Sequence, residues 1–199
     1  MAEKRSFSNL KAGKEVPGGD IRTGRQLRGA VLKEALVREL EDFFGSDARR
    51  IAHAKKVMEF AEKMLKRERA DYTIVIPAAI LHDVGIKPAE EKYGSAGGQL
   101  QEKEGPAVAR KILRKIGMKK DRIGEICRII ASHHSPGEVN TVNFRVLYDA
   151  DWLVNFGGEF KGLRRTERER LINRIFLTET GRLIASVLYL KPVLKKRRV

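Results

Sequence analysis

Apolar residues along this chain recur mostly at spacings of three and four, which is the period of an α-helix. We see no internal repeat and no convincing alternation of apolar and polar positions, the pattern of a half-buried strand. The pattern predicts helices over residues 27–45, 47–69, 71–84, 106–117, 119–132 and 144–156, and one or two more over 166–190. We therefore expect an all-α fold.

Local signals mark where some of these elements begin and end. Ser46 and Asp47 are good N-cap residues for the second predicted helix. Pro106 is a natural first-turn residue for the fourth. Residues 87–101 are rich in Gly, Lys and Glu and are expected to form a loop.

The length of 199 residues and the 42% of hydrophobic residues are enough for one domain with a proper core. We assign it to residues 25–190, between a basic, irregular arm over 1–24 and a basic tail over 191–199. No apolar run reaches the length of a membrane span, and the N-terminus lacks a hydrophobic signal region. The single Cys127 excludes an internal disulfide and argues against a cysteine-based zinc site. These features predict a cytoplasmic protein.

Polar residues interrupt the apolar faces of the predicted helices. His82 shares a face with Val75, Ala78 and Ala79, and Asp83 follows it at the end of the same apolar run. Burying an imidazole and a carboxylate is costly unless something compensates them. A bound metal ion is the usual compensation where further His and Asp residues converge.

The chain supplies such residues on three other predicted helices. His53 lies on the apolar stripe of the second, His133 and His134 follow the fifth, and Asp151 faces inward on the sixth. Asp149, two positions before Asp151, points elsewhere on that helix. A lone histidine on an apolar face is more often a core residue than a ligand, so a metal site is indicated only by these residues together.

The order His…His-Asp…Asp resembles that of the HD-domain superfamily of metal-dependent phosphohydrolases. The string Ala-Ala-Ile-Leu-His-Asp-Val-Gly over 78–85 looks like the central motif of that family. Asp-Ala-Asp-Trp-Leu over 149–153 looks like its closing motif, in which the ligand follows Ala and corresponds to Asp151. Thr-Glu-Thr-Gly-Arg over 178–182 resembles a C-terminal string of some uncharacterised members. The resemblance covers residues 47–156 and implies a single HD-type helical bundle.

The resemblance also implies a first metal site made of His53, His82, Asp83 and Asp151, with Asp83 as the natural bridge to a second ion. Mixed imidazole and carboxylate ligands suit Mn, Fe, Co, Ni or Zn, and carboxylates also admit Mg. A bound divalent ion can lower the pKa of water from about 16 to about 7, which supplies a nucleophile at neutral pH. The cofactor is therefore expected to be one or two divalent ions.

A second site would take Glu104 and one of two adjacent histidines. In one dinuclear subgroup of the family a His precedes Gly-Pro, where this chain has Glu-Gly-Pro over 104–106. Glu104 could replace that His as an oxygen ligand, or could be only a favourable charge at a helix start. His134, which precedes Ser135, corresponds best to the other extra histidine, and His133 remains an alternative. No Gly-Tyr-Pro follows this pair, which argues against cyclic-dinucleotide hydrolysis.

The expected activity is hydrolysis of a nucleotide or another small phosphoester by metal-activated water, with Asp83 as a catalytic residue. Lys87, four residues later, could bind the substrate phosphate or be an exposed loop lysine, and Arg145 has less support in the same role. The formal charge of +15 agrees with an anionic substrate but does not select one. Nucleic acid is less favoured, because no aromatic pattern interleaves with the basic residues.

Two other classes of function stay open. A di-iron oxygenase with an HD-type fold, such as myo-inositol oxygenase, would use the same ligands to activate dioxygen. A non-catalytic, metal-stabilised module would bind a nucleotide or RNA without turning it over. Oxygen consumption distinguishes the first class, and tight binding without turnover distinguishes the second.

Overall fold

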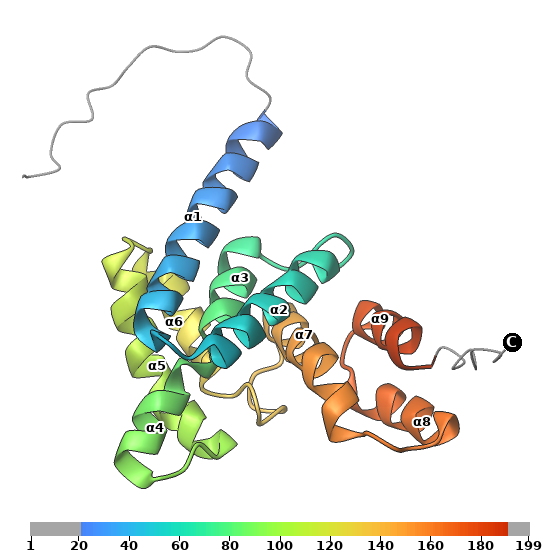
Figure 1. Cartoon of the computed structure of the whole chain (residues 1–199). Helices are drawn as coiled ribbons and strands as arrows, with labels where there is room; N and C mark the ends of the chain where they lie inside the picture. The colour runs from blue at the N-terminus through green and yellow to red at the C-terminus, as the bar shows by residue number, and fades with distance from the viewer. Residues whose placement is uncertain (1–20, 191–199) are drawn as a thin grey trace, which may run out of the picture.

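The structure is a computed structural model that describes residues 21–190. Over this range it is built from helices without strands, so the predicted all-α fold is confirmed (Figure 1). The elements are α1 (Ile21–Phe44), α2 (Ala48–Met64), α3 (Tyr72–Leu81), the 3₁₀ helix η1 (His82–Gly85), α4 (Ile86–Tyr93), α5 (Gly98–Lys115), α6 (Lys120–Ile130), α7 (Val142–Glu159), α8 (Arg165–Ile175) and α9 (Glu179–Tyr189). Residues 1–20 of the expected arm and the expected tail over 191–199 lie outside the described residues.

Helix α3 lies at the centre of the fold and is apolar on every side. All eight residues from Ile74 to Leu81 are buried, and α1, α2, α6 and α7 pack around them. A helix that is apolar around its whole circumference needs other elements over all its faces. Among residues 21–190, no helix is both long and apolar enough to cross a membrane. The packing around α3 therefore fixes where the chain delivers His82 and Asp83.

The α-helix changes to a 3₁₀ helix at the end of α3. The sequence predicted a continuous helix over 71–84, but Leu81 is the last α-helical residue and η1 follows. Short 3₁₀ stretches are common at helix ends. η1 packs against α5 so closely that a side chain at Gly85 would overlap the backbone carbonyl of Gln101. The prediction missed this turn because it fits a partner helix that is distant in the sequence.

The predicted loop over 87–101 is wrong, since the chain there forms α4 and the start of α5. Helix α4 buries only two side chains, too few to give a visible period, and it ends at Gly94, whose left-handed φ of 66° closes the helix. Helix α5 begins at Gly98, and Pro106 lies inside it rather than at its first turn. Most side chains in the first two turns of α5 are polar, so the sequence shows no helical period of apolar residues there.

The inward face of α1 lies in the second half of the helix. Leu36, Leu40 and Phe44 are buried at spacings of four, whereas Val31 is 66% exposed. The first half of α1 extends beyond the other helices (Figure 1). Within the described range, Val31 therefore has no layer to pack into.

The remaining predicted helices are present as α2, α6 and α7, and the stretch 166–190 contains two helices, α8 and α9. Asp47 caps α2 as expected, because its carboxylate accepts the backbone N–H of Arg50 at 3.1 Å. The boundaries differ from the predicted ones by several residues at some ends. Gly157 and Gly158, for example, lie inside α7 and do not stop it.

Asp149 connects the last two helices to α7. It is fully buried, and its carboxylate accepts the backbone N–H groups of Leu177 at 2.8 Å and Thr178 at 2.7 Å, as well as the Thr178 hydroxyl at 2.7 Å. Thr178 in turn caps α9 by accepting the N–H of Gly181. The string over 178–182 therefore contacts the same helix that carries Asp151.

We expect the Asp71→Ala variant to lose about 1 kcal/mol of unfolding free energy, the usual cost of removing an N-cap side chain. Asp71 caps α3, and its carboxylate accepts the N–H of Thr73 at 2.8 Å and the Thr73 hydroxyl at 2.7 Å. Urea unfolding followed by circular dichroism would measure the change. Asp71→Asn keeps a capping oxygen and should retain most of the stability; equal losses in both variants would contradict this role.

Candidate metal centre

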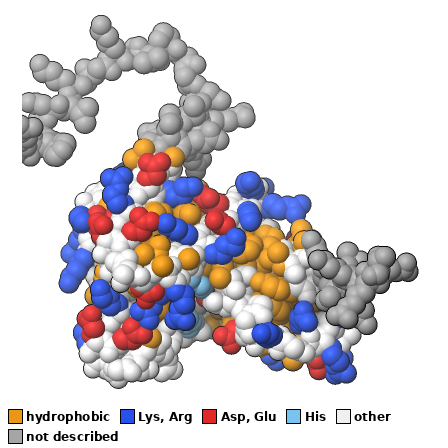
Figure 2. Space-filling view, in the orientation of Figure 1, with side chains coloured by type: hydrophobic (Ala, Val, Ile, Leu, Met, Phe, Trp, Pro, Cys, Tyr) orange, Lys and Arg blue, Asp and Glu red, His pale blue; other side chains and the backbone are white. Residues whose placement is uncertain are grey.

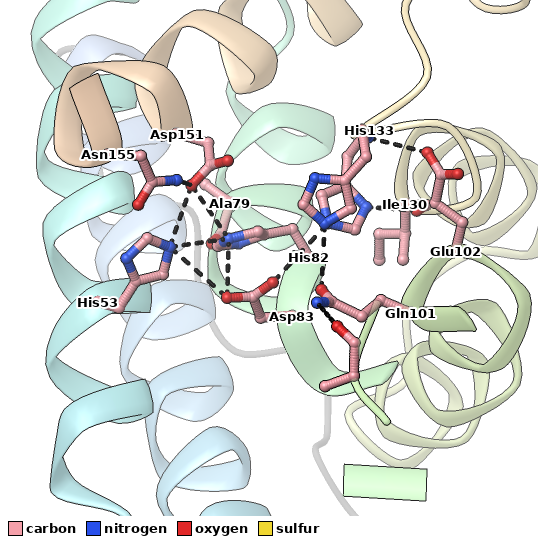
Figure 3. A network of polar contacts seen from close by, with 12 residues as sticks. His53, Ala79, His82, Asp83, Gln101, Glu102, Ile130, His133, Asp151 and Asn155 are labelled. Atoms are coloured by element: carbon pink, nitrogen blue, oxygen red, sulfur yellow. Dashed lines mark hydrogen bonds and ion pairs between the residues drawn. The ribbon is translucent and has the colours of Figure 1, made fainter. Parts of the chain in front are cut away.

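His82 and Asp83 reach the site from η1 (Figure 3). His82 is fully buried, and its Nδ1–H donates to the carbonyl of Ala79 at 2.9 Å. This hydrogen bond orients the ring and leaves Nε2 directed toward the other polar residues. Asp83 Oδ2 lies 3.4 Å from that Nε2.

Helices α2 and α7 bring His53 and Asp151 to the same place. His53 Nε2 lies 3.2 Å from His82 Nε2 and 3.0 Å from Asp151 Oδ1. Asn155, one turn after Asp151, donates to the same carboxylate oxygen at 2.9 Å. The ligand atoms of His53, His82 and Asp151 all lie within 4.8 Å of one another, which is close enough to hold one metal ion.

The turn after α6 brings His133 and His134 to the other side of Asp83. His133 is buried, its Nδ1–H donates to the carbonyl of Ile130 at 2.7 Å, and its Nε2 lies 3.8 Å from Asp83 Oδ1. His134 is exposed, and its Nε2 lies 3.2 Å from Gln101 Oε1. Asp83, His133 and His134 form a second group whose ligand atoms lie within 4.8 Å of one another. The sequence left open which histidine faces the site, and the structure brings both to it.

Asp83 lies between the two groups. Its Oδ2 faces His53 at 3.5 Å and His82 at 3.4 Å, while its Oδ1 faces His133 at 3.8 Å (Figure 3). A carboxylate with one oxygen toward each group has the arrangement that a bridge between two cations requires. Of the residues in these groups, Asp83 is thus the one placed to serve both.

The two carboxylates attract positive charge to this site. Burial disfavours charge on Asp83, but His82 and His133 outweigh it and hold the pKa of this carboxyl well below its usual range. Burial is also outweighed at Asp151, where hydrogen bonds from His53 and His82 lower the pKa. Burial alone would lower the pKa of His82, but Asp83 and Asp151 raise it well above its usual value. Either a proton on His82 or a bound divalent cation would compensate the negative charge of these two carboxylates.

An orphaned atom shows that these residues fit a metal ion. Within the described part of the chain, His133 Nε2 is a buried side-chain nitrogen with no hydrogen-bond partner. Because the Nδ1–H donates to Ile130, Nε2 is the atom of this ring that is free to act as a ligand. Leaving a buried polar atom unpaired is costly, and a cation beside Asp83 would remove that cost. Imidazole nitrogens and carboxylate oxygens are ligands that divalent transition metals accept.

The two groups open into a cleft of about 570 Å³. Figure 2 shows histidine side chains at the bottom of a hollow on this face, with charged side chains nearby. The lining residues outside the two groups are mostly polar or charged: Arg49, Arg50, Glu90, Gln101, Asn155 and Glu159, together with Ile86 and Ala96. A cleft of this size and lining suits a small polar molecule.

Glu104, expected as a ligand of a second ion, joins neither group. Its buried carboxylate pairs with Lys92 and accepts the Tyr93 hydroxyl at 2.9 Å, and these two hydrogen bonds lower its pKa. Because α5 begins at Gly98, Glu104 lies inside the helix and is not a charge at its start. Glu104 therefore connects α5 to α4.

The cleft lining includes neither Lys87, which could bind the substrate phosphate or be an exposed loop lysine, nor Arg145, which had less support in the same role. Lys87 donates to the backbone carbonyl of Phe43 at 3.3 Å and lies over the Phe43 ring. Arg145 donates to Asn140 at 2.7 Å. The spacing of four between Asp83 and Lys87 does not place them on one face, because η1 changes the helical twist between them.

Sequence analysis missed Arg49 and Arg50, which line the cleft from the first turn of α2. They precede His53 by four and three positions, a spacing that places them on the same side of the helix one turn earlier. That spacing was a usable signal. Gln101 was missed for a different reason, since its helix was taken for a loop.

Comparisons with known proteins agree with this site. A model of the HD domain family matches residues 50–155. The crystal structure of a predicted HD superfamily hydrolase from an uncultured Thermotogales bacterium is 30% identical, with 79% of this chain and 84% of that chain covered and a TM-score of 0.56. No curated protein matches significantly. The matched ranges and the His and Asp cluster establish that the chain belongs to the HD domain family, within a superfamily of metal-dependent hydrolases.

Proposed function

We propose that this protein is a phosphohydrolase that uses divalent metal ions to hydrolyse a nucleotide or another small phosphoester. The proposal depends on one observation: two groups of metal ligands share Asp83 at the bottom of an open cleft. Divalent ions bound there would neutralise phosphate charge and lower the pKa of a water nucleophile. Membership of the HD family supports hydrolysis, and a phosphoester is the substrate class that we propose.

The ligand residues would bind two ions in two groups. His53, His82 and Asp151 would hold one ion, and His133 and His134 the other, with Asp83 between them. The hydrogen bonds from the Nδ1–H groups of His82 and His133 to backbone carbonyls keep each Nε2 directed into the site.

The arginines at the start of α2 would bind the anionic end of the substrate. Arg50 is oriented by Asp47 at 3.1 Å and by Glu90 at 2.6 Å, so its guanidinium has a defined direction in the cleft wall. Arg49 is exposed beside it. A guanidinium can bind two oxygens of one phosphate at once, which suits this role. These residues replace Lys87 as the proposed phosphate-binding group.

A substrate screen tests the proposal. The chain, purified without a metal-binding tag, would be loaded with Mn, Fe, Co, Ni, Zn or Mg in turn and incubated with nucleotides and other phosphoesters, with and without oxygen. We expect product release that needs a divalent ion, continues without oxygen and stops with a chelator. Turnover that requires iron and oxygen would instead identify an oxygenase. Tight binding of a nucleotide or RNA without turnover would identify a binding module.

We expect the Arg49→Gln variant to raise KM for a phosphoester about tenfold, with little change in kcat, because Arg49 contributes to binding of the phosphate and not to the bond-breaking step. A tenfold effect corresponds to about 1.4 kcal/mol, a reasonable value for one charge-assisted hydrogen bond. Steady-state kinetics would measure it. Arg38→Gln removes the same charge from an exposed position on α1 and is the matched control. Equal KM values for both variants would contradict the role of Arg49.

A further inference from the structure

We infer that Glu102 is a positioning residue of the metal centre, which holds the turn carrying His133 and His134 against Asp83. The inference rests on the second ligand group of the proposed function, but not on the identity of the substrate. No sequence motif pointed to Glu102, which lies between the expected loop over 87–101 and the expected helix over 106–117. The side chain does not belong to either ligand group.

The turn that carries the two histidines is held from within only by local backbone hydrogen bonds, from the Ser132 N–H to Ile129 at 3.2 Å and from the Ser135 N–H to Ser132 at 3.0 Å. Helix α6 ends at Ile130, and residues 131–134 form turns rather than a regular helix. The one hydrogen bond of the His133 ring goes to Ile130, which lies at the start of the same turn. That bond sets the rotation of the ring, but it does not set the distance between the turn and Asp83 on η1.

Glu102 holds the backbone of this turn from α5, next to the contact between Gln101 Oε1 and the His134 ring. Glu102 is 9% exposed, its Oε1 accepts the backbone N–H of His134 at 2.8 Å, and its Oε2 accepts the Ser135 hydroxyl at 2.9 Å. Figure 3 shows the carboxylate directed at the turn. Two oxygens of one rigid group thus bind two consecutive residues. A charged acceptor makes stronger hydrogen bonds than a neutral one, so the contact is well suited to fix the backbone.

The same face of α5 also contacts η1, which carries Asp83. One turn after Glu102, Gly105 lies between Ile130 and η1, and a Cβ there would lie 2.9 Å from Ile130 Cγ2 and 3.6 Å from the Gly85 nitrogen. One turn before Glu102, a Cβ at Gly98 would lie 2.9 Å from the His134 ring. Helix α5 therefore contacts both halves of the second ligand group, and Glu102 is its link to the backbone of the histidine half.

Cobalt binding by the full chain tests this role without any need for a substrate. The metal-stripped protein would be dialysed to equilibrium against Co²⁺, and bound ions per chain would be measured. We expect close to two ions for the wild type and close to one for Glu102→Ala, in which the His133–His134 turn is released. Glu102→Gln should bind close to two, because its amide oxygen can accept from His134 while its NH₂ donates to the Ser135 hydroxyl. Glu125→Ala, which removes a carboxylate that accepts a hydrogen bond from Asn143 and belongs to neither ligand group, should also bind two.

Folding of each variant would be checked by circular dichroism. A folded Glu102→Ala protein that binds two Co²⁺ ions with wild-type affinity would overturn the inference, as would a wild type that binds a single ion. If Glu102→Ala does not fold, Ser135→Ala decides: it removes one of the two hydrogen bonds, and we expect about tenfold weaker binding of the second ion, about 1.4 kcal/mol. Unchanged affinity in Ser135→Ala would then overturn the inference. A third outcome separates the two proposals. If the wild type binds two ions and Glu102→Ala binds one, but the wild type hydrolyses no phosphoester, only the proposed function is overturned.

Discussion

The Asp83→Ala variant is expected to lose metal binding and to lower phosphoester hydrolysis about a thousandfold or more. Asp83 Oδ2 lies 3.4–3.5 Å from the Nε2 atoms of His82 and His53, and its Oδ1 lies 3.8 Å from that of His133. Removing one group that stabilises transition-state charge typically costs about 10²–10³ in kcat. Asp83 serves both ligand groups, so its loss should exceed the cost of removing a ligand that serves one.

Metal content measured by mass spectrometry and initial rates of hydrolysis would check this expectation. Asp83→Asn should behave almost like Asp83→Ala, since it keeps the shape of the side chain and removes the charge. Asp121→Ala changes an exposed aspartate in the first turn of α6 and should keep both metal and activity. Hydrolysis at the wild-type rate by metal-free Asp83→Ala would refute the assignment of the site.

The second large effect concerns stability. We expect Asp149→Ala to lower the free energy of unfolding by about 3 kcal/mol. The substitution leaves the N–H groups of Leu177 and Thr178 and the Thr178 hydroxyl without their acceptor, and each unsatisfied buried group costs about 1–3 kcal/mol. Part of this loss is offset, because burial itself disfavours the carboxylate and raises its pKa to about 6.

Urea unfolding would measure the change, and hydrogen exchange would locate it. We expect the amides of α9 to exchange faster in Asp149→Ala than those of α3, because the lost hydrogen bonds connect α9 to the rest of the bundle. Asp42→Ala, at an exposed position on α1, is the matched control and should change the stability by less than about 0.5 kcal/mol. If Asp149→Ala loses no more stability than the Asp42→Ala control, this buried carboxylate does not hold the last two helices.

Much of the fold followed from local pattern. The apolar run over 74–81 predicted a buried helix, and Asp47 predicted the start of α2. The pattern failed over 87–101 because α4 buries two side chains and the first turns of α5 are polar. A helix that buries polar residues against a functional site lacks the apolar period by which helices are recognised.

The sequence by itself determined the all-helical fold, the family resemblance and the polar residues that face inward, because period, order and the cost of burying charge are properties of the chain read along its length. Only the tertiary structure decided which of these residues meet. It turned Glu104 toward Lys92 and Glu102 toward the histidine turn, although the two lie on one helix two positions apart. It also decided that the basic residues lining the cleft are Arg49 and Arg50 and not Lys87. The directions of the Glu102 and Glu104 side chains depend on how α5 packs against η1 and α6, and those contacts join residues that are far apart in the sequence.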